Sequence, residues 1–161
     1  MSRPVAAVAP ITAEAFAPFG TLIERPASIG ERSFYSNWLG ADGLSPVLHV
    51  NHVAQSALPL TLDSLERHPH VAQVFVPLDV GRYLVTVAPS LPDGRPDLSG
   101  LRSFEVPASI GVIYATGVWH AGARVLDRDG AFAVLMWRGA ADDDVFTAIE
   151  PVDLIDGKVA E

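Results

Sequence analysis

The chain has 161 residues, which is enough to bury a hydrophobic core, and we expect residues 1–161 to form a single domain. It contains no cysteine, which excludes disulfides, thiolate zinc sites and thiol nucleophiles, and its net charge of −8 argues against a nucleic-acid partner. No apolar run approaches the roughly 20 residues of a membrane helix, and Pro4, Pro10 and Glu14 interrupt the apolar N-terminus, so we expect a soluble cytoplasmic protein.

The predicted elements run from one short helix into a series of strands. Thr12 can cap a helix over residues 13–16, which Pro18 and Gly20 would end. Residues 25–45 are polar and irregular, which predicts a long loop. Segments rich in β-branched and aromatic residues predict strands at residues 47–53, 71–77, 82–88, 103–106, 111–115 and 131–137.

The connections between these strands decide the fold class. Proline and glycine separate most of the strands, and the linkers are too short for the crossover helices of a parallel sheet. Residues 59–66 and 97–101 can each hold a helical turn. We therefore predict an all-β fold, a barrel or a sandwich, with a few short helices.

Two segments that are far apart in the sequence carry the residues that favour a functional site. In the first, Glu66 and His68 are two positions apart and point to the same side of an extended chain, a conformation that Pro69 favours. Gln73 follows five positions later, so a turn or bulge near Pro69 is needed to bring it to the same side. The second segment ends in His120, directly after a predicted strand and its turn.

Together these residues are typical of a metal site. Glu66, His68, Gln73 and His120 offer one carboxylate, two imidazoles and one amide, which suit a divalent ion with open positions for substrate or water. A simpler interpretation stays open, in which Glu66 is a surface charge and His68 caps a turn. The acidic run at residues 142–144 is predicted to be a solvated loop, because consecutive residues point apart on any regular element.

Longer stretches around these residues resemble the ureidoglycolate lyase (ureidoglycolate hydrolase) family. The family's order and spacing recur in PLTLDSLERHPHVAQVFVPL, RPDLSGLRSFEV, GVIYATGVWH and MWRGAADDDV, and PITAEAFAPFGTLIE matches in type near the N-terminus. The resemblance covers most of the chain except residues 25–51. It implies a cupin-like β-barrel or jelly roll, a homodimer, and cleavage of ureidoglycolate to glyoxylate and urea in allantoin (purine) breakdown.

The resemblance also implies how the metal site and the reacting groups are arranged. The general cupin motifs map onto Glu66, His68, Gln73 and His120, which would line the mouth or interior of the barrel and hold a divalent ion such as nickel. His68, His120 and Glu66 are the predicted catalytic residues, because cleavage needs proton transfer from the substrate hydroxyl and to the departing urea nitrogen.

Substrate binding is expected to involve an arginine, whose planar fork matches a carboxylate. Arg67, Arg102 and Arg138 lie in the matching segments, although the simpler interpretation of any one arginine is a solvated surface charge. Tyr114 and Gln73 are further predicted substrate contacts, and Tyr114 can alternatively belong to the core.

Three positions depart from the family pattern and keep other functions open. Ala115 and Ala121 stand where the family tends to carry histidine, and His52 stands where an arginine is common. One alternative function is a non-catalytic cupin that binds or senses a small molecule. Another is a different metal-dependent cupin enzyme, an isomerase or a dioxygenase.

Overall fold

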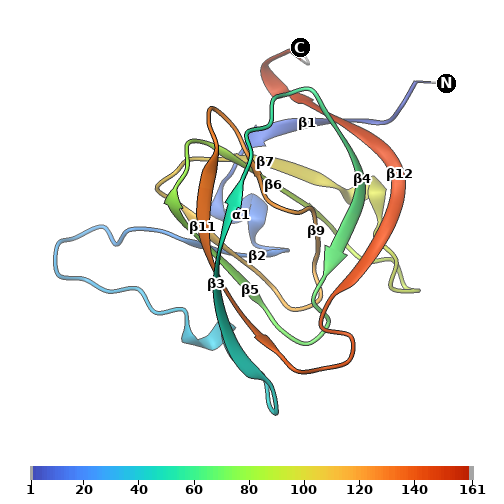
Figure 1. Ribbon diagram of the computed structural model, residues 1–161. Helices are drawn as coiled ribbons and strands as arrows, with labels where there is room; N and C mark the ends of the chain where they lie inside the picture. The colour runs from blue at the N-terminus through green and yellow to red at the C-terminus, as the bar shows by residue number, and fades with distance from the viewer. Residues whose placement is uncertain (1, 160–161) are drawn as a thin grey trace.

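The computed structural model describes residues 2–159, which form mostly strands with a few short helical turns (Figure 1). The strands are β1 (Val5–Pro10), β2 (Gly20–Ile23), β3 (Ser45–Val53), β4 (Leu60–Arg67), β5 (Gln73–Asp79), β6 (Tyr83–Ala88), β7 (Arg102–Val106), β8 (Gly111–Tyr114), β9 (Trp119–His120), β10 (Arg124–Val125), β11 (Gly130–Arg138) and β12 (Val145–Asp156). The helical elements are α1 (Ala13–Phe16), η1 (Ser36–Trp38), η2 (Leu98–Gly100) and η3 (Gly157–Val159). None of the helices within the described range is long and apolar enough to cross a membrane. The predicted all-β fold, a barrel with a few short helices, is confirmed.

Two sheets build the barrel. The first sheet has the order β10-β6-β7-β1-β12-β4-β9, and an additional pairing between β6 and β9 closes it. The second sheet has the order β2-β8-β5-β11-β3, so β3 lies at one of its edges. Figure 1 shows β4 and β12 on one side of the molecule and β11, β3 and β5 on the other, with β9 between them in this view.

The described residues form three hydrophobic cores, of which the two larger ones contain most of the buried side chains. The larger core combines side chains from both sheets and is rich in aromatic rings, such as Phe75 and Phe132, which pack edge to face with centroids 5.6 Å apart. The second core contains Leu62, Leu65 and Trp119, which come from strands of the first sheet. Because successive side chains of a strand alternate, Trp119 enters the second core while its neighbour His120 points the other way.

Most of the predicted elements are confirmed. The Thr12 hydroxyl accepts a hydrogen bond of 3.1 Å from the Ala15 amide and caps α1. The predicted helical turn at residues 59–66 is wrong, because this segment is strand β4. A register shift opposite β12 lets both Leu62 and Leu65 enter the second core, and this three-residue spacing imitates that of a helix.

Gly20 allows β2 to approach β8 closely, directly opposite Tyr114. A Cβ atom at this position would clash with the carbonyl oxygen of Ile113, and the backbone φ of +157° is rarely adopted by other residues. We expect Gly20→Ala to lower the free energy of unfolding by at least about 2 kcal/mol, because β2 must move away from β8. Denaturant unfolding measures this change.

The matched control is Gly30→Ala. Gly30 also has a positive φ, +88°, but a Cβ atom there would meet nothing within 4 Å. The free energy of unfolding of this variant should fall by only about 1 kcal/mol, which is the cost of a side chain in the left-handed backbone conformation. Equal losses in the two variants would contradict the role given to the β2–β8 contact.

Candidate functional site

Glu66, His68 and His120 meet at one point. Glu66 lies directly opposite His120 in the register of β4 and β9, and His68 follows the end of β4. The ring centroids of the two histidines are 5.2 Å apart, and Nε2 of His120 lies 3.6 Å from Oε1 of Glu66. One possible ligand atom from each residue lies within 4.8 Å of the others. The predicted turn at residues 69–70 is present, and it leads the chain from this cluster into β5.

The hydrogen bonds of both histidines leave the same ring nitrogen free. Nδ1 of His120 lies 2.9 Å from the carbonyl oxygen of Val118. Nδ1 of His68 lies 3.0 Å from Oδ1 of Asp144 and 3.2 Å from the carbonyl oxygen of Asp143. These partners only accept hydrogen bonds, so Nδ1 carries the hydrogen and Nε2 is bare. Both Nε2 atoms are buried without a hydrogen-bond partner, as expected of metal-ligating histidines.

Burial keeps the His120 ring neutral. Loss of contact with water lowers the pKa of His120 to about 3, the neighbouring His68 ring adds to this effect, and the hydrogen bond to Val118 opposes it. The Tyr114 ring stacks on His120 with centroids 4.2 Å apart and an interplanar angle of 12°. Burial also raises the pKa of Tyr114, so its phenol stays protonated and can donate a hydrogen bond.

Glu66 is affected by burial in the opposite sense. Loss of water raises the pKa of its carboxyl group and Asp144 adds to this, while His68 and Arg138 oppose it. A carboxylate with a raised pKa is a stronger base, and a cation placed beside it would be stabilised. Two bare imidazole nitrogens and this carboxylate therefore fit a divalent metal ion.

Asp144 links His68 to Arg138. The Asp144 carboxylate accepts two hydrogen bonds from Arg138, of 2.7 and 3.1 Å, and its Oδ1 faces Nδ1 of His68. Such carboxylate–histidine pairs fix the tautomer and orientation of a ligand ring. Asp144 is therefore a positioning residue. Sequence analysis missed it, because its place beside His68 depends on the pairing of β12 with β4.

The acidic run lies in the predicted loop, between β11 and β12, and its other two residues also make specific contacts. The Asp143 carboxylate accepts hydrogen bonds from the amides of Gly139 and Ala140, at 2.9 and 3.0 Å, and closes the turn between β11 and β12. Asp142 lies 2.7 Å from Nε2 of His70 at the surface. Each of the three carboxylates has a different partner, as expected of consecutive residues that point apart.

Gln73 is buried and lies opposite Tyr114 in the β5–β8 register. Its amide nitrogen donates a 3.6 Å hydrogen bond to the sulfur of Met136, and its amide oxygen is buried without a partner. A free oxygen is what a ligand or a substrate contact requires, and both predicted roles of Gln73 stay predictions.

The three predicted substrate-binding arginines lie in different places. Arg138 borders the cluster, but its guanidinium is paired with Asp144. Arg67 lies 4.7 Å over the ring of Trp119, which points into the second core, away from His120. The structure therefore does not bring Arg67 to the free Nε2 atoms.

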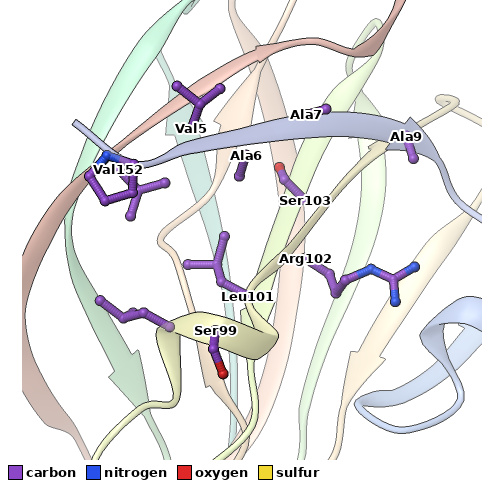
Figure 2. Close-up of a pocket in the computed structure, with 11 residues that line it drawn as sticks. Val5, Ala6, Ala7, Ala9, Ser99, Leu101, Arg102, Ser103 and Val152 are labelled. Carbon is purple, nitrogen blue, oxygen red and sulfur yellow. The ribbon is translucent and has the colours of Figure 1, made fainter. Parts of the chain in front are cut away.

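Arg102 lies at another cavity, between β1, η2 and β7. Its guanidinium lies 5.6 Å over the ring of Phe104. Figure 2 shows the Arg102 side chain extending away from Leu101 at this cavity. None of the three site residues Glu66, His68 and His120 lines it, so the structure does not bring Arg102 to the cluster either.

Comparison with known proteins identifies the family of the chain. The model of the ureidoglycolate lyase family matches residues 3–153. A ureidoglycolate lyase of Burkholderia cepacia is 37% identical, covering 82% of this chain and 79% of that protein, and one of Schizosaccharomyces pombe is 29% identical, covering 83% and 85%. Among solved structures, RmlC from Streptococcus suis in complex with dTDP-D-xylose is 15% identical with a TM-score of 0.47, covering 87% of this chain and 74% of that one, which is too distant to support an inference. The match to the family model and the relatives together establish that the chain belongs to the ureidoglycolate lyase family.

Proposed function

We propose that this protein is a ureidoglycolate lyase, which cleaves ureidoglycolate to glyoxylate and urea in allantoin breakdown. The observation that carries the proposal is the meeting of two bare, buried Nε2 atoms with the Glu66 carboxylate in a chain of this family. Ureidoglycolate carries a carboxylate, a hydroxyl and a ureido group on one carbon. The hydroxyl proton must leave, the carbon–nitrogen bond must break, and the departing nitrogen must gain a proton.

Glu66, His68 and His120 would hold a divalent ion, and Gln73 would offer a fourth ligand. Nickel is the ion that the resemblance to the family implies. When bound, such an ion supplies a Lewis acid that polarises the substrate hydroxyl. The bare Nε2 atoms and the raised pKa of Glu66 fit this assignment, because all three groups gain from a neighbouring cation.

The side chains of the site perform the remaining steps. A member of the cluster of Glu66, His68 and His120 that is free of the ion would accept the hydroxyl proton and return it to the departing nitrogen. Tyr114, which stays protonated, donates a hydrogen bond to the substrate from beside His120. Asp144 and Arg138 hold the His68 ring in its orientation.

The proposal includes a homodimer in the cytoplasm, formed through the outer face of the second sheet. Leu48 and Val50 are 70% and 63% exposed on β3, a nine-residue edge strand without charged residues. Half-buried Ala133 of β11 pairs with exposed Val50 on one side and with exposed Val76 on the other, so apolar side chains form a row across three strands. An uncharged apolar face on an open edge can meet its own copy across a two-fold axis.

The catalytic roles are tested with His68→Ala and His120→Ala. Each should lower kcat/KM for ureidoglycolate by about 100-fold or more, since a positioned catalytic group supplies at least that factor. Release of glyoxylate and urea is the measurement, with circular dichroism as the check on folding. His70→Ala is the control, because His70 contacts Asp142 at the surface.

Wild-type turnover in either site variant would contradict the proposed residues. If ureidoglycolate raises the melting temperature of the wild-type protein but no product forms, the chain is the binding or sensing alternative.

Metal affinity tests the role of Asp144. Asp144→Ala should weaken divalent-ion binding roughly 10- to 100-fold, because His68 loses the carboxylate that orients its ring. Titration of nickel against a competing chelator measures the dissociation constant. Asp142→Ala removes a carboxylate from the same loop but leaves His68 untouched, so it should bind nickel as the wild-type protein does. Equal affinity in all three proteins would rule out a positioning role.

The dimer is tested with Leu48→Asp. A charge on β3 should convert the dimer to a monomer in size-exclusion chromatography with light scattering, since it would face its own copy across the interface. Ile29→Asp, at a fully exposed loop residue, is the control and should leave the dimer intact. A wild-type monomer, or an unchanged Leu48→Asp dimer, would contradict this part of the proposal.

A further inference from the structure

A cavity of about 170 Å³ opens beside Glu66, between β4 and the segment that joins β9 to β10. The cavity exists because the neighbouring backbones separate there: β9 pairs with β4 only at the Glu66–His120 position, and β10 pairs with β6 instead. Its lining residues are Leu62, Ser64, Leu65, Glu66, Gly122, Arg124 and Phe146. The cavity is therefore lined by Glu66, which belongs to the proposed catalytic cluster, and by the positively charged Arg124.

The charge of Arg124 is not neutralised by a carboxylate. The ion pairs formed among residues 2–159 do not include Arg124. Its one hydrogen bond runs from Nη1 to the carbonyl oxygen of the adjacent Ala123 and is long, at 3.4 Å. The guanidinium lies beside Gly122, where a Cβ atom would be in ordinary van der Waals contact with Nη1 of Arg124 at 3.9 Å. Although the chain has a net charge of −8, the Arg124 guanidinium in this cavity forms no ion pair with a carboxylate of the described residues.

The other arginines considered for substrate binding are placed differently. Arg138 is held by Asp144, while Arg67 and Arg102 stack on aromatic rings. Arg124 alone among these four lines a cavity that also contains Glu66. A guanidinium without a partner binds a carboxylate through two parallel hydrogen bonds, which is the strongest contact available to it.

We infer that Arg124 binds the carboxylate of a small 2-hydroxy acid in the cavity beside Glu66. The inference rests on the proposed function and names the group that recognises the substrate. The cavity is smaller than the roughly 300 Å³ at which drug-sized pockets begin, so it suits a ligand of few atoms. A carboxylate held at Arg124 leaves the adjoining hydroxyl carbon on the side of Glu66, whose cross-strand partner His120 presents a buried, bare Nε2.

Binding of two small probes tests the inference. Glycolate carries the carboxylate and hydroxyl of the expected ligand, and glycolamide replaces the carboxylate with a neutral amide. Calorimetric titration of the purified full-length protein should give tighter binding of glycolate than of glycolamide. Arg124→Gln should weaken glycolate binding roughly 10- to 100-fold, the loss expected for charged hydrogen bonds, and should leave glycolamide binding unchanged.

Two further variants make the result specific. Arg124→Lys keeps the charge but loses the fork, so it should retain part of the preference for glycolate. Arg128→Gln removes the same charge from a surface pair with Asp79 and should bind both probes as the wild-type protein does. The inference is overturned if the wild-type protein does not prefer glycolate, if Arg124→Gln retains that preference, or if Arg128→Gln loses it equally.

Turnover separates this inference from the proposed function. For ureidoglycolate, Arg124→Gln should raise KM more than it lowers kcat. If the wild-type protein releases urea and Arg124→Gln keeps its KM, the inference fails while the proposed function stands. If the wild-type protein releases no urea but binds glycolate through Arg124, the proposed function fails and the carboxylate site stands.

Discussion

The pairing of Glu66 with His120 is the contact on which the rest of the structure depends. β9 is only two residues long, yet it joins β4 to β6 and so closes the first sheet. Its two side chains serve opposite sides: Trp119 fills the second core, and His120 enters the site. Because one short strand both closes the barrel and places a catalytic side chain, the stability of the fold and the geometry of the site are linked.

The site also shows how polar groups are kept inside an apolar protein. Burying an unpaired imidazole nitrogen costs free energy, and here two of them are buried within reach of each other. The hydrogen bonds on the far side of each ring hold these nitrogens in place, through the Val118 carbonyl for His120 and through Asp144 for His68. The cost is offset when a ligand binds, which is the behaviour of a preorganised site.

Much of this arrangement could be predicted from local sequence. The alternation around Pro69 placed Glu66 and His68 on one side, and the strand pattern before His120 placed it at a strand end. Asp144 and Arg124 could not be found in this way, because their positions depend on which distant strands pair: β12 with β4 brings Asp144 to His68, and the separation of β9 from β4 opens the space for Arg124. The helical turn predicted at residues 59–66 has the same cause. The spacing of Leu62 and Leu65 follows from a register shift in the partner strand β12, which the local sequence of β4 does not reveal.

The position of β1 has a consequence for how the chain folds. β1 lies in the middle of the first sheet and pairs in parallel with β7 on one side and with β12 on the other. β1 therefore cannot complete its pairing until β12, the last of the described strands, has been synthesised. Contacts that span nearly the whole chain fold slowly, because their loop-closure entropy is lost before the contacts form. Until β12 is available, the backbone edge of β1 that it covers stays open to pairing with other strands.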